Sequence, residues 1–294
     1  LAASYAILAG STVTSTGVIG TVVTGNIGIF PGTAITGFPP AVLNGAVDSA
    51  NGASGGAQGA LTTAYNVLAG KAFNTTLSNQ DLGGMNLLPG VYKFDGGATL
   101  NGMLTLDAAG NASAVWMFQI GTTLLVAADS SVIFKDSVGN PDYVYWQVGS
   151  TATLAIGVPM VGNILALTSI IVNNGVTVRG RCLARNAEVT LDKSVIIVPP
   201  VLSFVVKQIV SGISEAQFYA DAELNSEILK SAIAETMPGV LPANIKDFNV
   251  SAGSASVRAR RALSADSIVL DYNVVVTANK TAEQLQDMLV ASAV

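Results

Sequence analysis

A repeat of 18 residues constrains the fold of this chain more than any other feature. Segments that begin at Trp146, Ile164 and Cys182 align with this spacing. Later segments keep the alignment: 153–154 with 171–172 and 189–190, and 158–160 with 176–178 and 194–196. Each unit therefore holds three short strand-like segments separated by corners, several of which carry glycine. An earlier, less regular unit begins at Phe118 and is interrupted around residues 136–142.

Three short strands per unit predict a three-sided parallel β-helix, in which successive coils stack about 4.7–4.9 Å apart. A single coil cannot bury its own apolar residues, so several coils must stack. We expect two inward-facing columns, and they consist of Met160, Val178 and Ile196, and of Trp146, Ile164 and Cys182. Cys182 is then a small core residue. Ser150, Thr168 and Asn186 are expected to form a hydrogen-bonded column at one corner.

Residues 42–70, which precede the repeat, have the periodicity of a helix. The apolar positions that follow helical spacing are Ala46, Ala50, Ala53, Ala57, Ala60, Leu61, Ala64 and Leu68. We expect this helix to pack along one side of the solenoid, where Leu165 and Leu183 would point outward and provide an apolar seat. The fold class is thus mainly β, an irregular β-helix with one long helix alongside.

The composition excludes several classes of function. Of the 294 residues, 50% are hydrophobic and 11% are charged, but no apolar run reaches the roughly 18 residues that a membrane-spanning helix needs. The net charge of −5 and the lack of a basic tract argue against nucleic-acid binding. The chain has no histidine and a single cysteine, so the commonest general base and metal ligand are missing. We expect no cofactor, no metal site and no enzymatic activity.

The sequence also suggests where the protein works. It begins at Leu1 without a charged leader, which we interpret as a secreted, extracellular chain whose signal peptide has been removed. Four Asn-x-Ser/Thr sequons, at Asn74, Asn111, Asn249 and Asn279, fit that compartment.

The charge density changes at Pro199-Pro200, and we place a domain boundary there. Residues 1–200 carry 16 charged side chains, whereas residues 201–294 carry 17 in less than half the length. The C-terminal part predicts a small α+β unit, with strands at 203–210, 245–250 and 268–276 and helices at 225–237 and from Thr281 onward. Its role stays open between a tether, an oligomerisation module and one repeat of a longer array. We expect a monomer whose C-terminal unit could bind another module.

Eight segments of residues 1–200 carry a family resemblance. They are YAILAGSTVT (5–14), TGNIGIFPGTAITGFPP (24–40), LTTAYNVLAG (61–70), LPGVYKF (88–94), AVWMFQIG (114–121), WQVGSTATL (146–154), VGNILALTS (161–169) and RGRCLARNAEVTL (179–191). In this order they resemble the ice-binding (antifreeze) protein family that is built on a domain of formerly unknown function. The resemblance implies an irregular three-sided β-helix with a helix alongside, adsorption to ice, inhibition of recrystallisation and a modest thermal hysteresis. It does not extend to residues 201–294.

Several members of that family carry a Thr-Ala/Gly-x-Thr/Asn motif on the face that contacts ice. Residues 33–36 (TAIT) match it, and residues 63–66 (TAYN) match it within the expected helix, where we interpret the match as a coincidence. The corners at 156–159, 174–177 and 192–195 read IGVP, NGVT and DKSV, so only the middle one is close. The resemblance therefore implies a less regular face than the motif alone suggests.

Ice offers a water lattice with no charge and no pocket, so its receptor must be flat, rigid and weakly hydrated. Threonine supplies a hydroxyl that can hold a lattice-like water and a methyl group that orders the waters around it. Our candidate ice-contacting residues are Thr21, Thr24, Thr33, Ala34, Thr36, Thr153, Ala155, Asn173, Asn174 and Thr177. The sequence leaves open which of the two uncovered faces of the solenoid they define.

Two other functions compete with this one. Carbohydrate-active enzymes also use parallel β-helices, but they need paired carboxylates, and none recur on one face here. An extracellular adhesion or structural surface module is the stronger alternative, because fold alone does not fix function. The two ideas combine in an ice adhesin, a protein that joins an ice-binding domain to a second module.

Overall fold

The computed structural model describes residues 4–17, 20–198, 201–211, 214–236, 245–252 and 267–277. The chain divides into two compact units, Leu1–Pro199 and Pro200–Val294. No helix among the described residues is both long and apolar enough to cross a membrane.

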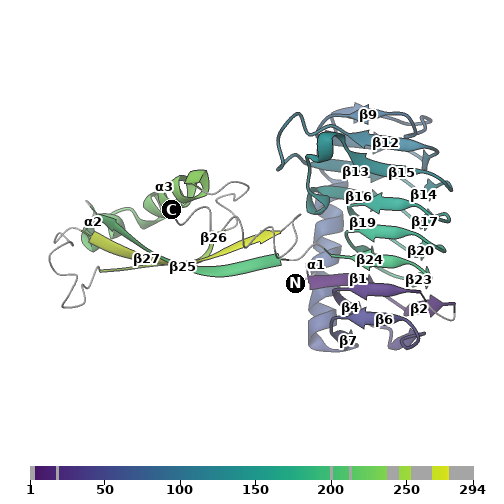
Figure 1. The fold of residues 1–294 in the computed structure, drawn as a ribbon, viewed down its shortest axis with the longest axis horizontal. Helices are drawn as coiled ribbons and strands as arrows, with labels where there is room; N and C mark the ends of the chain where they lie inside the picture. The colour runs from purple at the N-terminus through teal and green to yellow at the C-terminus, as the bar shows by residue number, and fades with distance from the viewer. Residues whose placement is uncertain are drawn as a thin grey trace. The chain divides into compact units, whose positions relative to one another are not determined.

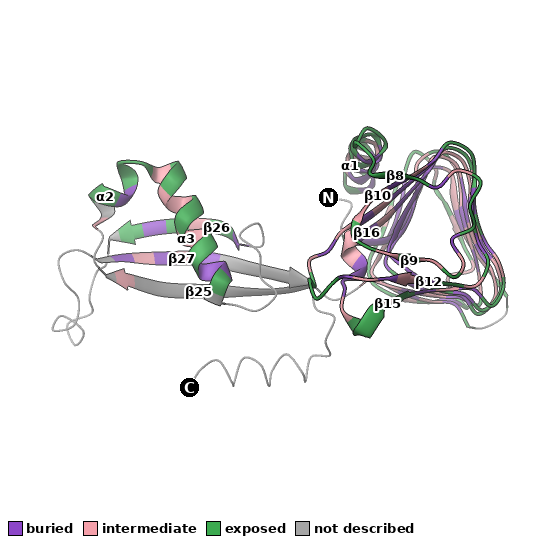
Figure 2. Cartoon of the chain, turned by 90° about the horizontal axis from the view of Figure 1, so that it is seen from above, coloured by how far each residue is buried: buried purple, intermediate pink, exposed green. Residues whose placement is uncertain are grey.

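Unit 1 is a parallel β-helix with three sides, seen end-on in Figure 2. One side is sheet A, with β7 (Val47–Ser49), β4 (Asn26–Ile29), β1 (Tyr5–Ala9), β22 (Cys182–Ala184), β19 (Asn163–Ala166), β16 (Val144–Val148), β13 (Trp116–Ile120), β10 (Gly90–Phe94) and β8 (Thr75–Thr76) in this spatial order. The second side is sheet B, with β11 (Ala98–Leu100), β14 (Leu124–Val126), β17 (Ala152–Leu154), β20 (Ile170–Val172), β23 (Val189–Asp192), β2 (Thr12–Thr16) and β5 (Ala34–Thr36). This architecture confirms the predicted fold class.

The third side is split into two sheets. Sheet C contains β18 (Pro159–Val161), β21 (Thr177–Arg179), β24 (Val195–Ile197), β3 (Val22–Thr24) and β6 (Val42–Asn44). Sheet D continues the same side with β15 (Ser131–Phe134), β12 (Met103–Leu106) and β9 (Asn86–Leu87). β15 and β18 are neighbours without forming a ladder, so this side is less continuous than sheet B.

The order of the coils in space differs from their order in the sequence (Figure 1). The N-terminal strands stack beneath the last coil of the repeat: β1 pairs with β22, β2 with β23 and β3 with β24. The first two coils therefore extend the ladder from its C-terminal end. Helix α1 (Gly52–Ala69) then carries the chain back along the solenoid before β8 begins the opposite end. At 1.5 Å per residue it covers about 27 Å of that path.

Both predicted inward columns are present. Met160, Val178 and Ile196 are buried partners across sheet C, and Trp146, Ile164 and Cys182 are buried partners across sheet A. The second column continues into a stack of aromatic rings, with ring centroids 4.0 Å apart between Trp146 and Phe118 and 5.6 Å apart between Phe118 and Tyr92. The interior of the solenoid is therefore filled by side chains in registered layers.

The 18-residue spacing fails on sheet B in one coil. Ile170 pairs with Val189 and Ile171 with Thr190, which are 19 residues apart, whereas the spacing on sheets A and C is 18. Our alignment of residues 171–172 with 189–190 was therefore wrong by one position. Since strand side chains alternate between the two faces, the shift turns Val189 inward and Thr190 outward.

The helix begins later than predicted. Residues 42–44 and 47–49 form β6 and β7, and Asn51 caps α1 with a reciprocal capping box to Ser54. Ala50 has a φ of 46°, which is incompatible with a continuous helix through this point. Ala57, Leu61 and Leu68 are buried as expected, but Ala53 and Ala64 are exposed.

The α1 helix packs on sheet A, where Leu165 and Leu183 provide the expected apolar seat. Leu8, Leu61 and Tyr65 complete the contact. Hydrogen bonds lock the helix in place: Gln58 Nε2 donates to the carbonyl of Ala184 at 3.1 Å, and Gln119 Nε2 donates to that of Leu68 at 2.8 Å. Figure 2 shows α1 outside the triangle, beside the strands of sheet A.

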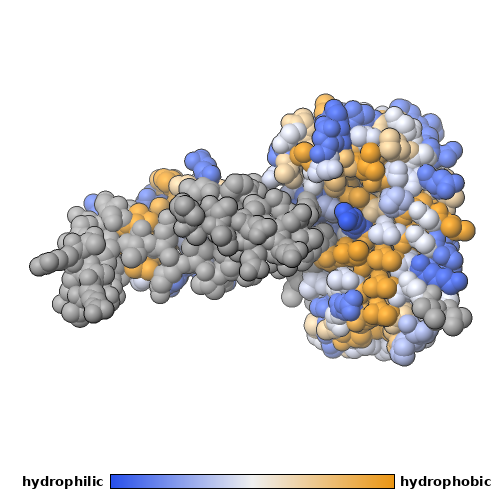
Figure 3. Space-filling model, in the orientation of Figure 1, coloured by the Kyte–Doolittle hydropathy of each residue, from blue (hydrophilic) through white to orange (hydrophobic). Residues whose placement is uncertain are grey.

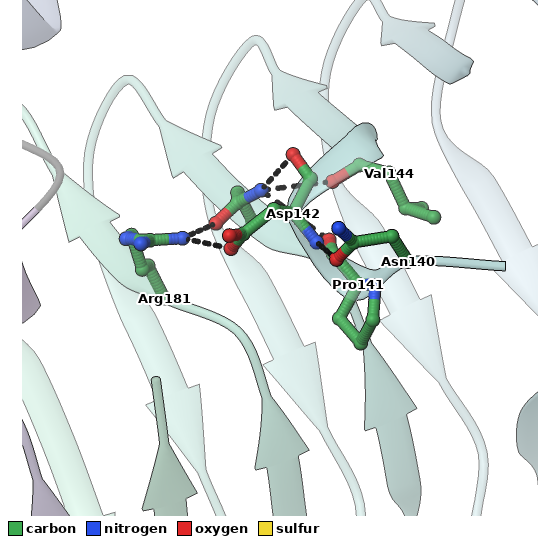
Figure 4. Close-up of polar contacts among 6 residues, drawn as sticks. Asn140, Pro141, Asp142, Val144 and Arg181 are labelled. Atoms are coloured by element: carbon green, nitrogen blue, oxygen red, sulfur yellow. Dashed lines mark hydrogen bonds and ion pairs between the residues drawn. The ribbon is translucent and has the colours of Figure 1, made fainter. Parts of the chain in front are cut away.

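The insertion around residues 136–142 forms two short 3₁₀ turns, η2 (Lys135–Ser137) and η3 (Pro141–Tyr143), and η3 lies beside β19. Arg181 Nη1 pairs with the carboxylate of Asp142 and donates to Asn163 Oδ1 at 2.8 Å (Figure 4). The amide of Asn163 donates in turn to the carbonyls of Asp142 and Val144. This buried network ties the insertion to the two coils that follow it.

Unit 2 contains β25 (Val201–Ser211), α2 (Glu215–Tyr219), α3 (Ala222–Thr236), β26 (Ile245–Ala252) and β27 (Ser267–Thr277), with β27 central in an antiparallel sheet. Both helices contact β26, and Phe218, Ile233 and Leu270 belong to the core between them and the sheet. The apolar spacing of Ile228, Leu229, Ala232 and Ile233 predicts that these four residues share one side of α3. Ile233 is buried, but Ile228 and Ala232 are exposed, so the helix is turned from that orientation. The helix expected from Thr281 lies outside the described residues.

Candidate functional site

One outward column runs along the seven strands of sheet B without a charge. The pairing registers join Thr99 to Leu125, Leu125 to Thr153, Thr153 to Ile171, Ile171 to Thr190, Thr190 to Thr14 and Thr14 to Thr36. Five of these seven side chains are threonines, and six are β-branched. Their stiff side chains stand on a hydrogen-bonded ladder, so the column is a regular row of hydroxyl and methyl groups.

Two flanking columns widen this row into an array. One side presents Gly97, Thr123, Thr151, Ser169, Glu188, Thr12 and Ala34, and the other presents Asn101, Ala127, Ala155, Asn173, Asp192 and Thr16. Neighbouring columns lie two residues apart along each strand, about 6.6 Å, and neighbouring rows lie about 4.8 Å apart. The result is a two-dimensional lattice of small, mostly uncharged groups.

Hydrogen bonds hold parts of the array in place. Thr36 Oγ1 donates to Thr14 Oγ1 at 3.3 Å, and Thr16 Oγ1 donates to the carbonyl of Leu191 at 3.2 Å. The amide of Asn173 donates to the carbonyl of Leu154 at 2.8 Å. The expected corner column is present in part, because Thr168 bonds to Ser150 and more closely to Thr151, at 2.9 Å.

The structure separates the predicted candidates into three groups. Ala34, Thr36, Thr153, Ala155 and Asn173 lie on the outer side of sheet B, among the residues just described. Thr33 and Asn174 lie at the corners next to it, exposed and half-buried respectively.

Three candidates do not belong to this array. Thr24 and Thr177 are half-buried residues of sheet C, on a different side of the solenoid. Thr21 is only 3% exposed, so its prediction as an outward residue was wrong. It lies two residues before the buried Val23 and therefore shares its inward direction in the strand alternation.

The sequence reasoning missed several residues of the central row, among them Thr14, Thr99 and Thr190. Thr12 and Thr16, in the flanking columns, were missed as well. One signal was available, because residues 12–16 read TVTST and alternate as a half-buried strand does. No comparable signal marks Thr190, because it depends on the one-residue shift of its coil.

The side formed by sheets C and D differs from sheet B in composition. Its outward positions include Pro159, Val195, Val22 and the half-exposed Val42, and Arg179 is exposed among them. Figure 3 shows this side, with hydrophobic residues in a vertical stripe over sheet C. This side is therefore more apolar than sheet B and carries few hydroxyl groups.

Metal-ligating and nucleophilic side chains form a site only in the geometry that each kind of site needs. No group of three or more His, Cys, Asp or Glu residues in the described part of the chain could hold a metal ion. Burial raises the pKa of the Cys182 thiol from 9.0 to about 12, which makes it a poor nucleophile. The outer side of sheet B thus presents mainly hydroxyl, methyl and amide groups.

Comparison with known proteins agrees with this geometry. Residues 7–197 match the sequence model of a family described as ice-binding-like. The chain belongs to this family. Residues 201–294 lie beyond the matched region.

Ice-binding proteins from several kinds of organism resemble this chain in sequence or in structure. An ice-binding protein from Nostoc sp. (strain HG1) is 45% identical over 192 residues, which are 65% of this chain and 70% of that protein. The crystal structure of an ice-binding protein from the Antarctic ascomycete Antarctomyces psychrotrophicus superposes with a TM-score of 0.64 at 36% identity, covering 68% of this chain and 96% of that one. A second crystal structure, of an ice-binding protein from an Antarctic biological consortium, gives a TM-score of 0.63 at 37% identity, covering 66% of this chain and 87% of that one.

Proposed function

We propose that this protein binds ice through the outer side of sheet B and thereby inhibits ice growth and recrystallisation. The observation that carries the proposal is the registered row of Thr99, Leu125, Thr153, Ile171, Thr190, Thr14 and Thr36. Membership of the ice-binding-like family and the named ice-binding relatives support it.

The physical basis is the match between a rigid array and an uncharged solid. Each threonine hydroxyl can hold one water and each methyl group leaves its neighbours weakly hydrated, so the interfacial water needs little rearrangement. One such contact is weak, but contacts held rigidly in register act together, and the affinity rises as their number grows. The ladder beneath the row supplies that rigidity, because every strand of sheet B except the two at its ends, β11 and β5, is paired on both sides.

The other two sides of the solenoid suit ice less well. Sheet A is covered by α1 over much of its length. The side of sheets C and D is discontinuous between β15 and β18, carries the exposed Arg179, and presents mainly aliphatic groups. Sheet B combines continuity, hydroxyl groups and low charge.

The decisive experiment compares tyrosine substitutions on two sides of the solenoid. Thr153→Tyr and Thr36→Tyr place a bulky ring on sheet B, and Thr177→Tyr places the same ring on sheet C. We expect both sheet B variants of the full chain to lose most of the thermal hysteresis, while Thr177→Tyr retains it and all three keep the wild-type circular dichroism. Loss with Thr177→Tyr and retention with both sheet B variants would assign ice binding to sheet C and reject the proposal.

We place ice binding in residues 1–200 and a separate role in residues 201–294, which lie beyond the family match. A secreted monomer that carries such a second unit could also serve as an ice adhesin. Ice-affinity partition distinguishes the alternatives. A pure adhesion module is excluded from a growing ice hemisphere, whereas an ice-binding protein is incorporated into it.

A further inference from the structure

A row of acidic side chains crosses the otherwise uncharged outer side of sheet B. The coil of β23 presents Glu188, Thr190 and Asp192 at its three outward positions. At the same positions the coil above presents Ser169, Ile171 and Asn173, and the coil below presents Thr12, Thr14 and Thr16. Among the outward positions of these seven described strands, Glu188 and Asp192 are the charged ones.

Both carboxylates belong to the surface of the array. Glu188 and Asp192 are half-buried, and Glu188 accepts a hydrogen bond from Ser169 Oγ at 3.0 Å. Asp192 lies beside Gly17, where a Cβ atom would come within 2.9 Å of its Oδ1. The Glu188 carboxylate is thus tied to the array by a hydrogen bond, and the Asp192 carboxylate lies close to the backbone of the neighbouring coil at Gly17.

The row coincides with the irregular coil. The corner before β23 contains the extra residue that changes the spacing from 18 to 19. The corner after it is one residue shorter and places Lys193 at a φ of 41°, where the coils above have Gly157 and Gly175. The two carboxylates and the two corners of unusual length thus belong to the same coil, that of β23.

We propose that Glu188 and Asp192 divide the surface on sheet B into two patches and thereby limit its affinity for ice. One patch comprises the coils of β11, β14, β17 and β20, and the other comprises those of β2 and β5. A carboxylate orients water in a strong hydration shell that does not fit an ice lattice, so the waters on the two patches cannot join into one ordered layer. The inference rests on the proposed function, and it names the residues that set the strength of binding.

The test removes the two charges with little change of shape. Glu188→Gln keeps an oxygen that can accept the hydrogen bond from Ser169, and Asp192→Asn restores the amide that Asn173 has at the equivalent position. We expect the double variant of the full chain to show about twice the thermal hysteresis of the wild type, because contacts of the two patches then act together. Each single variant should give a smaller increase. Glu188→Thr, which matches the threonine content of the array, is a second variant that should also increase it.

The matched control is Asp136→Asn, which removes one exposed carboxylate from η2, away from sheet B. Its hysteresis should equal that of the wild type, and an equal increase in this control would attribute the effect to net charge and overturn the inference. The inference would also be overturned if the double variant and Glu188→Thr both showed unchanged hysteresis and the circular dichroism spectrum of the folded wild type. In that case loss of activity in Thr153→Tyr would still support ice binding by sheet B, whereas inactivity of the wild type would reject the proposed function itself.

Discussion

The same coils build sheet A and sheet B, yet a helix covers the outer side of sheet A and leaves that of sheet B exposed. The outward residues of sheet A include Leu8, Leu165 and Leu183, and all three are buried under α1. The corresponding row on sheet B contains mainly threonine, and no other described element of unit 1 covers it. The same ladder geometry thus serves an internal interface on one side and an exposed surface on the other.

The difference shows how outward composition decides whether a solenoid face needs a cover. Burying a leucine side chain contributes about 1.5–3 kcal/mol, so a leucine column gains from a helix that excludes water. A threonine column would lose water contacts of its hydroxyl groups under such a cover, unless each hydroxyl found a new partner. Sheet B can therefore stay open to an external, uncharged partner.

The largest effect on stability is expected on the covered side, in the buried network around the insertion. Asp142→Ala removes the carboxylate that pairs with the guanidinium of Arg181, and both side chains are largely buried. Breaking such a pair costs about 3–5 kcal/mol. Urea denaturation followed by circular dichroism should show a lower midpoint than in Asp136→Asn, which changes an exposed carboxylate in the same insertion. Equal midpoints in the two variants would contradict a stabilising role for this pair.

A pair of leucine substitutions sharpens the contrast between the two sheets. Leu61 of α1 is fully buried against sheet A, whereas Leu125 on sheet B is 49% exposed. We expect Leu61→Ala to lower the free energy of unfolding by about 2–5 kcal/mol and Leu125→Ala by about 0.5 kcal/mol. Denaturant titrations of both variants measure this difference. Similar losses would mean that sheet B is also covered in solution.

The buried thiol beneath sheet A predicts a dependence of stability on pH. Cys182 has a folded-state pKa of about 12 because burial disfavours its thiolate, against an ordinary value of 9.0. The unfolded chain therefore releases this proton first, so the stabilisation is fully present below about pH 9 and is lost as the pH rises toward about 12. Thermal melting should show a steeper loss above about pH 9 in the wild type than in Cys182→Ala. Parallel curves would indicate that the thiol is accessible to water in the folded state.

The smallest effect concerns the corner between the two sheets. Thr168→Val removes the hydroxyl that bonds to Thr151 at 2.9 Å and to Ser150. The loss should be about 1 kcal/mol of unfolding free energy, because the part-buried hydrogen bond to Thr151 is broken and the contact with Ser150, at 3.5 Å, is long. Thermal hysteresis should stay at the wild-type level, since the corner lies outside the threonine row. A clear fall in hysteresis would extend the ice-binding surface into the corner.

Much of the fold can be predicted from the sequence because its signals are local. The alternation of apolar and polar residues gives the inward columns, and the repeat gives the stacking, so Met160, Val178 and Ile196 are found where expected. The helical spacing of Ala57, Leu61 and Leu68 likewise gives the buried side of α1. The predicted start of that helix was wrong, because the positive φ of Ala50 interrupts the helical backbone and Asn51 caps the helix that begins after it.

The candidate site was predicted only in part, because the strand register on sheet B decides which residues share its outer side. Thr36, Thr153 and Asn173 do lie on sheet B, but Thr24 and Thr177 belong to sheet C and Thr21 is buried. Thr190 joins the row only because an extra residue shifts its strand. Corner lengths of this kind are not visible in a periodicity that looks uniform in the sequence.

The sequence by itself determined that this protein is a stacked β-helix with low charge and an apolar interior, because those properties follow from residue types at regular local spacing. Only the tertiary structure decided that the N-terminal coils continue the repeat beyond its last coil, which brings Thr14 and Thr36 into line with Thr153 and Thr190. Contacts between β1 and β22 join residues about 175 positions apart in the chain, and no periodic pattern encodes them. The threonines of the proposed ice-binding surface are therefore far apart in the sequence. They form a continuous row only when the coils stack.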